Sequence, residues 1–324
     1  MKIPFIRRTI STRKIMLILI LSVIISGCAK EEKTNTAAEK MQKFVINISD
    51  YAKEYDPDFI IIPQNGIELA FNNIDADGEL NSAYITAIDG LGVEELFYDG
   101  GIVTDDYRLS MLQKIKTTEK IMVSEYVTDK NNVEDAIEKN YNEGFICFTR
   151  TGDNYYYSKI PESITNSNTT DITNLSLAQN YLYLISTDNY SSKEDMLNSI
   201  AETDYDLILI DLFFDDSEFS SAEIQQLKNK ANGGQRLVIS YISIGSVENY
   251  RYYWKSDWKR KNPDWIKKKY DGYEDEFWIE FWNEEWQNII YGNDSSYIKK
   301  IIDAGFDGVY LDNIEAYYFL YHNS

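Results

Sequence analysis

Histidine, cysteine and basic residues are scarce in this sequence. It has one histidine, His322, and two cysteines, Cys28 and Cys147, among 324 residues. A single histidine excludes histidine-ligated zinc and Ser-His-Asp hydrolysis. Two cysteines are too few for a disulfide scaffold or a cysteine-rich metal site. Carboxylates, tyrosines and lysines remain for acid–base chemistry, and we expect neither a cofactor nor a metal.

Acidic residues greatly outnumber basic ones. The chain has 53 Asp and Glu against 32 Lys and Arg, which gives a formal net charge of −21. An acidic chain does not neutralise phosphates, so we expect no nucleic-acid partner. The glycine-rich phosphate loops of nucleotide-binding folds are also missing from the sequence. The 26 tyrosines beside many carboxylates are typical of sugar-handling proteins, and an AT-rich genome produces the same bias.

The first 28 residues have the pattern of a lipoprotein signal. Five basic residues and no acid precede an apolar stretch at 15–25, which leads into Ile25-Ser26-Gly27-Cys28. This stretch is shorter than the roughly 20 residues that span a bilayer. The ending resembles a bacterial lipobox, in which Cys28 is lipidated and becomes the first mature residue; the alternative is an uncleaved membrane anchor.

The lipobox predicts a protein anchored to the cell membrane by lipid, on its extracytoplasmic face. Removal of residues 1–27 would change the formal net charge from −21 to −26. Residues 29–40 are polar, and we expect a flexible tether with a reach of roughly 20 Å.

Apolar runs alternate with segments of helical periodicity over residues 41–324. The nine runs, which we expect to be strands, are 59–62, 83–88, 121–126, 145–148, 181–185, 207–210, 237–242, 277–281 and 308–311. The expected helices are 41–55, 133–143, 193–203, 220–231 and 295–304. This alternation predicts a single α/β domain, either a barrel or an open doubly wound sheet. Nine strands are one too many for an eight-stranded barrel, so at least one run lies outside it or is not a strand.

Polar residues follow several of the expected strands. They are Gln64, Asn65, Glu125, Asp211, Glu248 and Asp312. Each acid alone could be a helix N-cap or an ion-pair partner. Together, at the carboxyl ends of parallel strands, they favour a carboxylate-lined cleft. Residues 151–180 interrupt the pattern with a stretch rich in Ser, Thr and Asn, which we expect to be an internal surface linker.

Two segments carry a family resemblance. Residues 241–251, with the tryptophan-rich stretch that follows, and residues 305–317, which contain Asp312-Asn313, resemble signatures of glycoside hydrolase family 114. This family comprises endo-α-1,4-polygalactosaminidase-like TIM barrels. Residues 59–66 and 88–98 match further segments of the family. The resemblance covers about residues 41–150 and 181–321, and it implies a (β/α)8 TIM barrel.

The order of these segments is inverted relative to the family. In the family, the Asp-Asn strand precedes the segments that match 59–66 and 88–98, whereas here it follows them. We therefore expect a circular permutant in which residues 151–180 join the family's two ends. This predicts that the strand ending at Asp312 lies beside the strand at 59–62. The alternative is a rearranged gene whose half-barrels pair between molecules.

The resemblance also implies the chemistry. A glycosidase needs two carboxylates, one as acid and one as base or nucleophile. Asp312 is the first choice, and Glu94 is the second, with its neighbour Glu95 left open. Residues expected to bind or orient substrate are Gln64, Asn65, Glu125, Asp211, Tyr241, Glu248, Arg251 and Trp282. Relatives often carry an acid directly after the position of Gly245, where this chain has Ser246. That acid's role would be lost here or pass to Glu248.

The expected function is hydrolysis of an α-linked, galactosamine-type polysaccharide by a lipid-anchored monomer. An acidic domain would attract such a polycation. The alternative is a non-catalytic surface lipoprotein that binds glycan in the same cleft. A solute-binding lipoprotein is disfavoured because the chain shows no two-lobe pattern.

Overall fold

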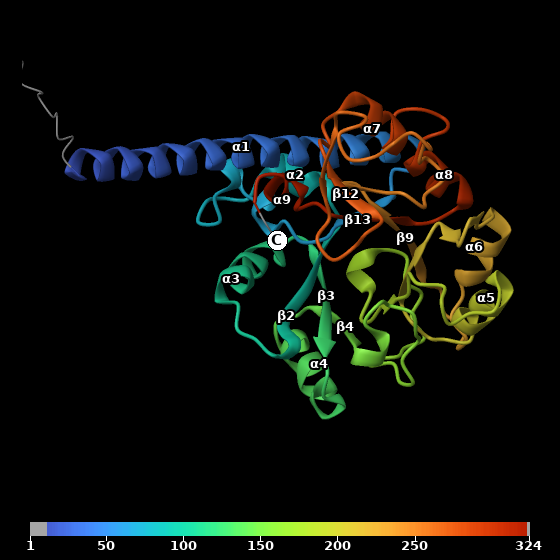
Figure 1. The fold of residues 1–324 in the computed structure, drawn as a ribbon. Helices are drawn as coiled ribbons and strands as arrows, with labels where there is room; N and C mark the ends of the chain where they lie inside the picture. The colour runs from blue at the N-terminus through green and yellow to red at the C-terminus, as the bar shows by residue number, and fades with distance from the viewer. Residues whose placement is uncertain (1–11, 323–324) are drawn as a thin grey trace, which may run out of the picture.

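A computed structural model describes residues 12–322, with side chains from residue 30 onward (Figure 1). The fold is α/β, with two parallel sheets. The larger sheet has the strand order β1-β13-β9-β6-β5, and the smaller one has the order β2-β3-β4. These strands are β1 (Ile60–Pro63), β2 (Gly90–Ile102), β3 (Lys120–Val127), β4 (Ile146–Arg150), β5 (Leu182–Tyr183), β6 (Leu207–Asp211), β9 (Leu237–Ser243) and β13 (Gly308–Asp312).

The two sheets meet at β1 and β2. Gln64 and Gly92 form a parallel bridge, and Asn65 N donates to Gly92 O at 2.7 Å. At the opposite edges, β4 and β5, the described residues form no ladder. The amides of Ile185 and Ser186 donate there to Tyr157 O, at 3.1 and 3.2 Å. Side chains, more than backbone pairing, hold this second seam.

The strand that ends at Asp312 lies beside the first strand of the chain. β13 pairs in parallel with β1, with Gly308 opposite Ile60 and Leu311 opposite Pro63. This confirms the adjacency that the inverted segment order predicts. β13 also pairs with β9 on its other side, so Asp312 lies opposite Ser243 in the middle of the larger sheet.

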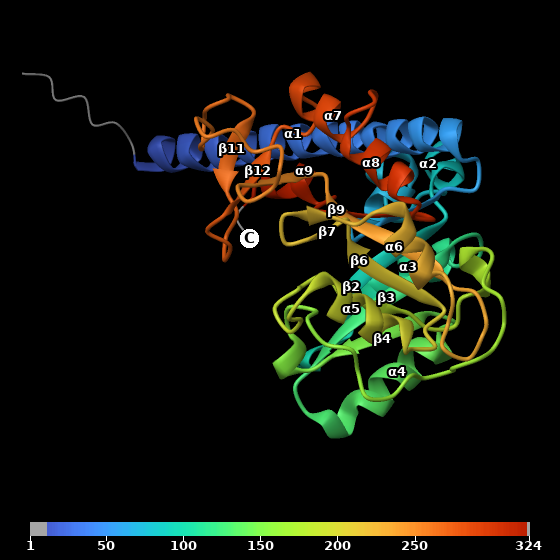
Figure 2. The same cartoon turned by 90° about the vertical axis from the view of Figure 1, so that its right-hand side faces the viewer.

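Helices pack around the sheets in both views (Figures 1 and 2). They are α1 (Thr12–Tyr55), α2 (Ser82–Ala87), α3 (Asp106–Ile115), α4 (Val133–Asn142), α5 (Lys193–Ala201), α6 (Ser221–Leu227), α7 (Glu284–Ile290), α8 (Tyr297–Ala304) and α9 (Ala316–Phe319). All five expected helices are present. Two further small sheets are antiparallel: β10 (Ser246–Glu248), β11 (Ile266–Lys269) and β12 (Glu276–Ile279) form one, and β7 (Phe213–Phe214) and β8 (Ser217–Glu218) form the other.

One run lies outside the parallel sheets, and one strand prediction is corrected by the structure. The run at 277–281 contributes to β12, which lies outside the parallel sheets. The run at 83–88 is helix α2, because the Asn81 side chain caps the amides of Ala83 and Tyr84 and the helix buries Tyr84 and Ala87 on one face. The parallel strand that was missed is β2, whose glycines and acids interrupt any apolar run.

The expected tether at 29–40 is helical and continues directly into the body of the protein. Ala37, Ala38 and Met41 are buried in the core. Alanine and methionine favour helix, and burial of this face against the domain holds the segment in that form. The flexible-coil prediction is therefore wrong for these residues. In Figure 1, the N-terminal turns of α1 extend beyond the rest of the molecule.

The linker at 151–180 takes part in the core as well as the surface. Ile172, Leu175 and Ala178 are buried, and Tyr157 is buried among aromatic rings. Its polar part is also anchored. Lys230 Nζ, which is fully buried, donates to Asn168 O and Thr170 O and pairs with Asp206 at 2.9 Å.

Candidate active site

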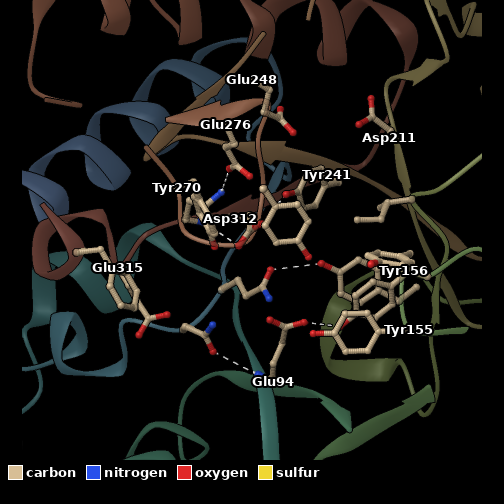
Figure 3. Close-up of a pocket in the computed structure, with 18 of the residues that line it drawn as sticks. Glu94, Tyr155, Tyr156, Asp211, Tyr241, Glu248, Tyr270, Glu276, Asp312 and Glu315 are labelled. Carbon is tan, nitrogen blue, oxygen red and sulfur yellow. Dashed lines mark hydrogen bonds between the residues drawn. The ribbon is translucent and has the colours of Figure 1, made fainter. Parts of the chain in front are cut away.

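A cavity of about 410 Å³ lies at the carboxyl ends of the parallel strands (Figure 3). Both predicted catalytic residues, Asp312 and Glu94, line it. Six of the eight residues predicted to bind substrate also line it. These six are Gln64, Asn65, Asp211, Tyr241, Glu248 and Arg251. The cavity is therefore the carboxylate-lined cleft that the strand ends predict.

Asp312 ends β13 with both carboxyl oxygens bonded. Tyr241 donates its hydroxyl to Oδ2 at 2.5 Å, and the Asn313 amide donates to Oδ1 at 2.7 Å. Burial, together with the nearby charge of Glu94, raises the pKa of Asp312 to about 7. A carboxyl group with this pKa can give or take a proton near neutral pH.

Glu94 and Glu95 both reach the cavity, although they are consecutive residues of β2. In a regular strand they would point to opposite faces. Here the ladder with β3 breaks after Glu94, and Glu95 has a φ of 56°, so the bulge turns both side chains inward. Arg150 Nη2 lies 2.6 Å from Glu95 Oε1 and 3.6 Å from Glu94 Oε1. The hydroxyl of Tyr157 also donates to Glu94.

Glu125 does not line the cavity, which corrects its predicted role in substrate binding. Its side chain is fully buried on the other face of β3. It accepts hydrogen bonds from the amides of Phe97 and Tyr98, at 3.0–3.2 Å, and from Asn140 Nδ2 at 2.8 Å. These two amides belong to the bulge that carries Glu94. Glu125 is a positioning residue because it satisfies the donors that the bulge removes from the ladder.

Arg108 satisfies the acceptors of the same bulge. Its guanidinium donates to Glu94 O at 2.7 Å and to Glu95 O at 2.5 Å, while Asp105 holds its Nε at 2.6 Å. The bulge is therefore fixed through its amides by one buried acid and through its carbonyls by one arginine.

A buried ion triad forms another wall of the cavity. Arg251 Nη1 lies 2.7 Å from Asp211 Oδ2, and its Nε lies 2.6 Å from Glu248 Oε2. Burial raises the pKa of Asp211, and the charge of Arg251 opposes that shift. Arg251 therefore orients two carboxylates, and one cation is shared between two acids.

Glu276 is a site residue that the sequence does not reveal. It lies on β12, and its Oε1 accepts from Asn313 Nδ2 at 3.0 Å and from the hydroxyl of Ser246. Burial and the charge of Glu248 raise the pKa of Glu276 to about 8. A carboxyl thus lies beside Ser246, where relatives often carry an acid, but it comes from another strand, while Glu248 is engaged with Arg251.

Two glycines are needed for close packing around these residues. A Cβ on Gly245 would lie 1.9 Å from Asn313 O, and a Cβ on Gly92 would lie 2.0 Å from the Tyr310 hydroxyl. Asn313 itself adopts a φ of 59°. The turn after Asp312 is therefore held against the strand that precedes Ser246.

Trp282 does not line the cavity, which corrects its predicted role in substrate binding. Its ring packs edge-on against Phe281, and Lys40 Nζ of α1 lies 4.1 Å from its centre. The chain passes from β12 towards α1 here, so Trp282 covers the long helix and does not face the strand ends.

Tyrosines provide most of the aromatic lining, and all but Tyr241 were missed. They are Tyr155, Tyr156, Tyr157, Tyr183, Tyr241, Tyr250, Tyr270 and Tyr273. Tyr157 stacks on Tyr183 at 3.9 Å between ring centres. Three consecutive tyrosines after Arg150 were the available signal, but they fall at the start of the expected linker.

The predicted lipid anchor falls largely outside the described residues. Residues 1–11 lie outside the described residues, and Cys28 lies in α1 with its side chain outside them. Within the described helices, none combines the length and apolar character needed to cross a membrane. Residues 30–322 bring together no three His, Cys, Asp or Glu side chains that could hold a metal ion.

The fold and site define an α/β protein with paired carboxylates at its strand ends, the class to which many glycosidases belong. Residues 164–324, about half of the chain, match the sequence model of Glycoside-hydrolase family GH114. Residues 164–324 therefore belong to this family.

Three curated relatives match parts of the chain, and all three are uncharacterized proteins. The one from Methanocaldococcus jannaschii is 34% identical over 163 residues, which cover 49% of this chain and 44% of the relative. The one from Thermotoga maritima is 30% identical over 36% of this chain and 35% of its own length. The one from Deinococcus radiodurans is 33% identical over 37% of each. The chain thus spans less than half the length of each relative.

Proposed function

We propose that this protein hydrolyses an α-linked, galactosamine-type polysaccharide with Asp312 and Glu94 as its two catalytic carboxylates. The observation that carries the proposal is that both residues line one cavity and that the pKa of Asp312 is raised to about 7. In this scheme, Asp312 is the general acid and protonates the leaving glycosidic oxygen. Glu94 is the nucleophile, or the base that activates water.

The surroundings of the two carboxyls support this division of roles. Glu94 faces the Arg150 guanidinium and accepts from Tyr157, and both groups stabilise a negative charge. Asp312 has no cation among its hydrogen-bond partners, which are Tyr241 and Asn313. The raised pKa of Asp312 suits a proton donor, and the contacts of Glu94 suit a group that carries negative charge.

The charge of the cavity favours a cationic sugar. Seven carboxyls line it, and they are Glu94, Glu95, Asp211, Glu248, Glu276, Asp312 and Glu315, against the two cations Arg150 and Arg251. The lining stays negative even when Asp312 and Glu276 are protonated. A sugar that carries an ammonium group would be concentrated there.

We also propose that the eight parallel strands are those of a circularly permuted TIM barrel. The bridge between Gln64 and Gly92 supports continuity of the two sheets. The C-terminal segment also contacts α1, since His322 Nε2 lies 3.1 Å from Thr34 Oγ1. If the two halves of the chain are in inverted order, a family model read in one direction can match only one of them. The match limited to residues 164–324 fits this order.

Lipid attachment at Cys28, an extracytoplasmic location and a monomeric state complete the proposal. The lipobox-like sequence before Cys28 supports the first two. Because 29–40 is helical, an anchor at Cys28 would hold the domain by a helix that enters the core at Ala37.

The test is hydrolysis of an α-1,4-linked galactosamine polymer by the detergent-purified full chain, with products read by mass spectrometry. We expect shortened oligomers from the wild type, and Asp312→Asn and Glu94→Gln should each lower the rate by 10²–10⁴. Glu138→Gln, which changes an exposed acid on α4, is the matched control.

Two outcomes would contradict the proposal. Hydrolysis by Asp312→Asn at the wild-type rate would remove Asp312 from catalysis. Binding of the polymer without cleavage by the wild type would instead establish the alternative, a glycan-binding surface protein.

A further inference from the structure

A second hollow, of about 690 Å³, opens directly from the catalytic cavity. The two share five lining residues, Tyr156, Ile185, Asp211, Tyr250 and Arg251. A chain-like ligand in the cavity can therefore continue into this hollow without crossing a wall.

Four aromatic side chains line this second hollow. Tyr156 is 63% exposed, Tyr250 59% and Tyr252 46%, and the half-buried Phe213 joins them. Single exposed aromatics are common on protein surfaces, but several that line one concave surface mark a binding site. We call this set of four rings the aromatic arm.

The outer part of the aromatic arm is supported from behind. Phe213 stacks on the buried Tyr297 at 5.9 Å, and Tyr252 lies 5.5 Å from both rings. Lys300 Nζ lies 5.4 Å from the Tyr252 ring centre. These contacts fix the rings while they leave nearly half of Tyr252 exposed. Such a surface needs little further ordering when a ligand binds.

The opposite end of the cavity has a different character. A third hollow, of about 390 Å³, shares Asn65, Glu94, Glu95 and Glu315 with the cavity, and no aromatic residue lines it. The three hollows therefore form one trough past Asp312 and Glu94, and aromatic rings line its middle and one of its two ends.

We propose that the aromatic arm binds a further sugar unit of the polysaccharide, beyond the unit held at Asp312 and Glu94. The proposal rests on the function proposed above and extends it to a second subsite. The apolar C–H face of a pyranose ring packs on an aromatic face, and an ammonium substituent is attracted by the ring electrons. Asp215 and Asp216 lie exposed at the rim and add charge complementarity.

The experiment compares substrates of increasing length on the full chain in detergent. The variants are Tyr156→Ala and Tyr252→Ala, and Tyr156→Phe and Tyr252→Phe retain the ring. For each alanine variant, we expect kcat/KM on the galactosamine polymer to fall roughly tenfold, which corresponds to 1.4 kcal/mol. The loss should grow with the number of sugar units, and each phenylalanine variant should restore the rate.

Controls separate this proposal from the function on which it rests. Tyr141→Ala removes a tyrosine that is 57% exposed on α4 and lines none of the three hollows, so its rates should match the wild type. Binding of the polymer is also measured in the Asp312→Asn background, where no hydrolysis intervenes. There, the added Tyr252→Ala change should weaken binding by a similar factor.

The outcomes are distinct. If the wild type cleaves the polymer and both alanine variants do so with an unchanged dependence on length, the aromatic arm is not a subsite. If the wild type binds the polymer without cleaving it and Tyr252→Ala weakens that binding, the subsite stands and the catalytic proposal falls. If the wild type neither binds nor cleaves the polymer, both fall.

Discussion

The hydroxyl of Tyr241 lies 2.5 Å from Oδ2 of Asp312 and donates a hydrogen bond to it. These residues lie on neighbouring strands, β9 and β13, that pair in parallel, so the contact is set by sheet register. A hydrogen bond of this kind favours the ionised carboxyl and therefore lowers its pKa. Tyr241 opposes the upward pKa shift that burial and the charge of Glu94 impose. It therefore keeps the pKa of Asp312 near neutral pH.

Tyr241→Phe should move the pH dependence of catalysis. The loss of the donor raises the pKa of Asp312 above about 7, by roughly one further unit. Because a general acid acts in its protonated form, the alkaline limb of kcat/KM should shift to higher pH. A pH–rate profile measures this, with Tyr141→Phe as the control. An alkaline limb that does not move would be inconsistent with Asp312 as the proton donor.

Glu125→Ala should damage both stability and activity, although Glu125 does not line the cavity. It would leave the Phe97 and Tyr98 amides and the Asn140 side chain without their acceptor. Each unsatisfied buried group costs about 1–3 kcal/mol. Thermal unfolding should occur at a lower temperature, and kcat should fall at least about tenfold while the fold persists, because Glu94 loses its support.

Two further variants separate positioning from general destabilisation. Glu125→Gln keeps an acceptor and should retain more activity than Glu125→Ala at equal fraction folded. Glu138→Ala should change neither property. A Glu125→Ala protein with wild-type kcat would show that the bulge does not depend on this carboxylate.

Glu276→Gln should stabilise the protein at alkaline pH. The pKa of Glu276 is raised to about 8, above its unfolded value of about 4.3, so its contribution to stability is lost as pH rises through about 8. Glutamine stays neutral and escapes this loss. The difference in melting temperature between variant and wild type should therefore be near zero at pH 4 and grow until about pH 8. A constant difference would contradict the raised pKa.

Glu276→Ala is the matched comparison for activity. It removes the acceptor of Ser246 and Asn313, and so frees the turn that follows Asp312. We expect a kcat about tenfold or more below that of Glu276→Gln, measured with the galactosamine polymer at pH 7. Equal rates for the two variants would show that the carboxyl does not hold this turn.

Cys28→Ala should abolish membrane anchoring. The variant should leave the membrane fraction or accumulate as an unprocessed precursor, because the thiol that accepts the lipid is gone. Fractionation and intact mass spectrometry of the cell-expressed protein measure this. A mature mass and membrane distribution equal to those of the wild type would contradict lipidation at Cys28.

The sequence predicts most of the parallel strands because each is buried on both faces and is therefore a continuous apolar run. β6 and β9 are examples, with every residue buried. β2 has no such run, because Gly92 lies under Tyr310 and Glu94 and Glu95 face the cavity. A strand that lines a polar cavity carries polar side chains there, so the apolar pattern that predicts buried strands does not reveal it.

The candidate site was predictable where a strand end carries it and not where distant segments converge. Asp312, Asp211 and Gln64 follow apolar strands directly, so their clustering follows from parallel pairing alone. Glu276 and the tyrosines at 155–157 reach the cavity from an antiparallel strand and from the linker, and no local pattern encodes that path. Glu125 has the right position, but strand alternation turns it to the other face of β3, opposite to Ser124, which contacts Tyr157.

The seam between β4 and β5 has no ladder of backbone hydrogen bonds among the described residues. In the described structure, this seam is held by two hydrogen bonds from backbone amides to Tyr157 O. It is also held by contacts among the rings of Phe148, Tyr157 and Tyr183. Rings slide past one another at less cost than a ladder of backbone bonds takes to break. Because Tyr157 also donates to Glu94, a displacement at this seam would move the proposed catalytic carboxylate with it. The rigidity of this seam and the position of Glu94 therefore both depend on the Tyr157 side chain.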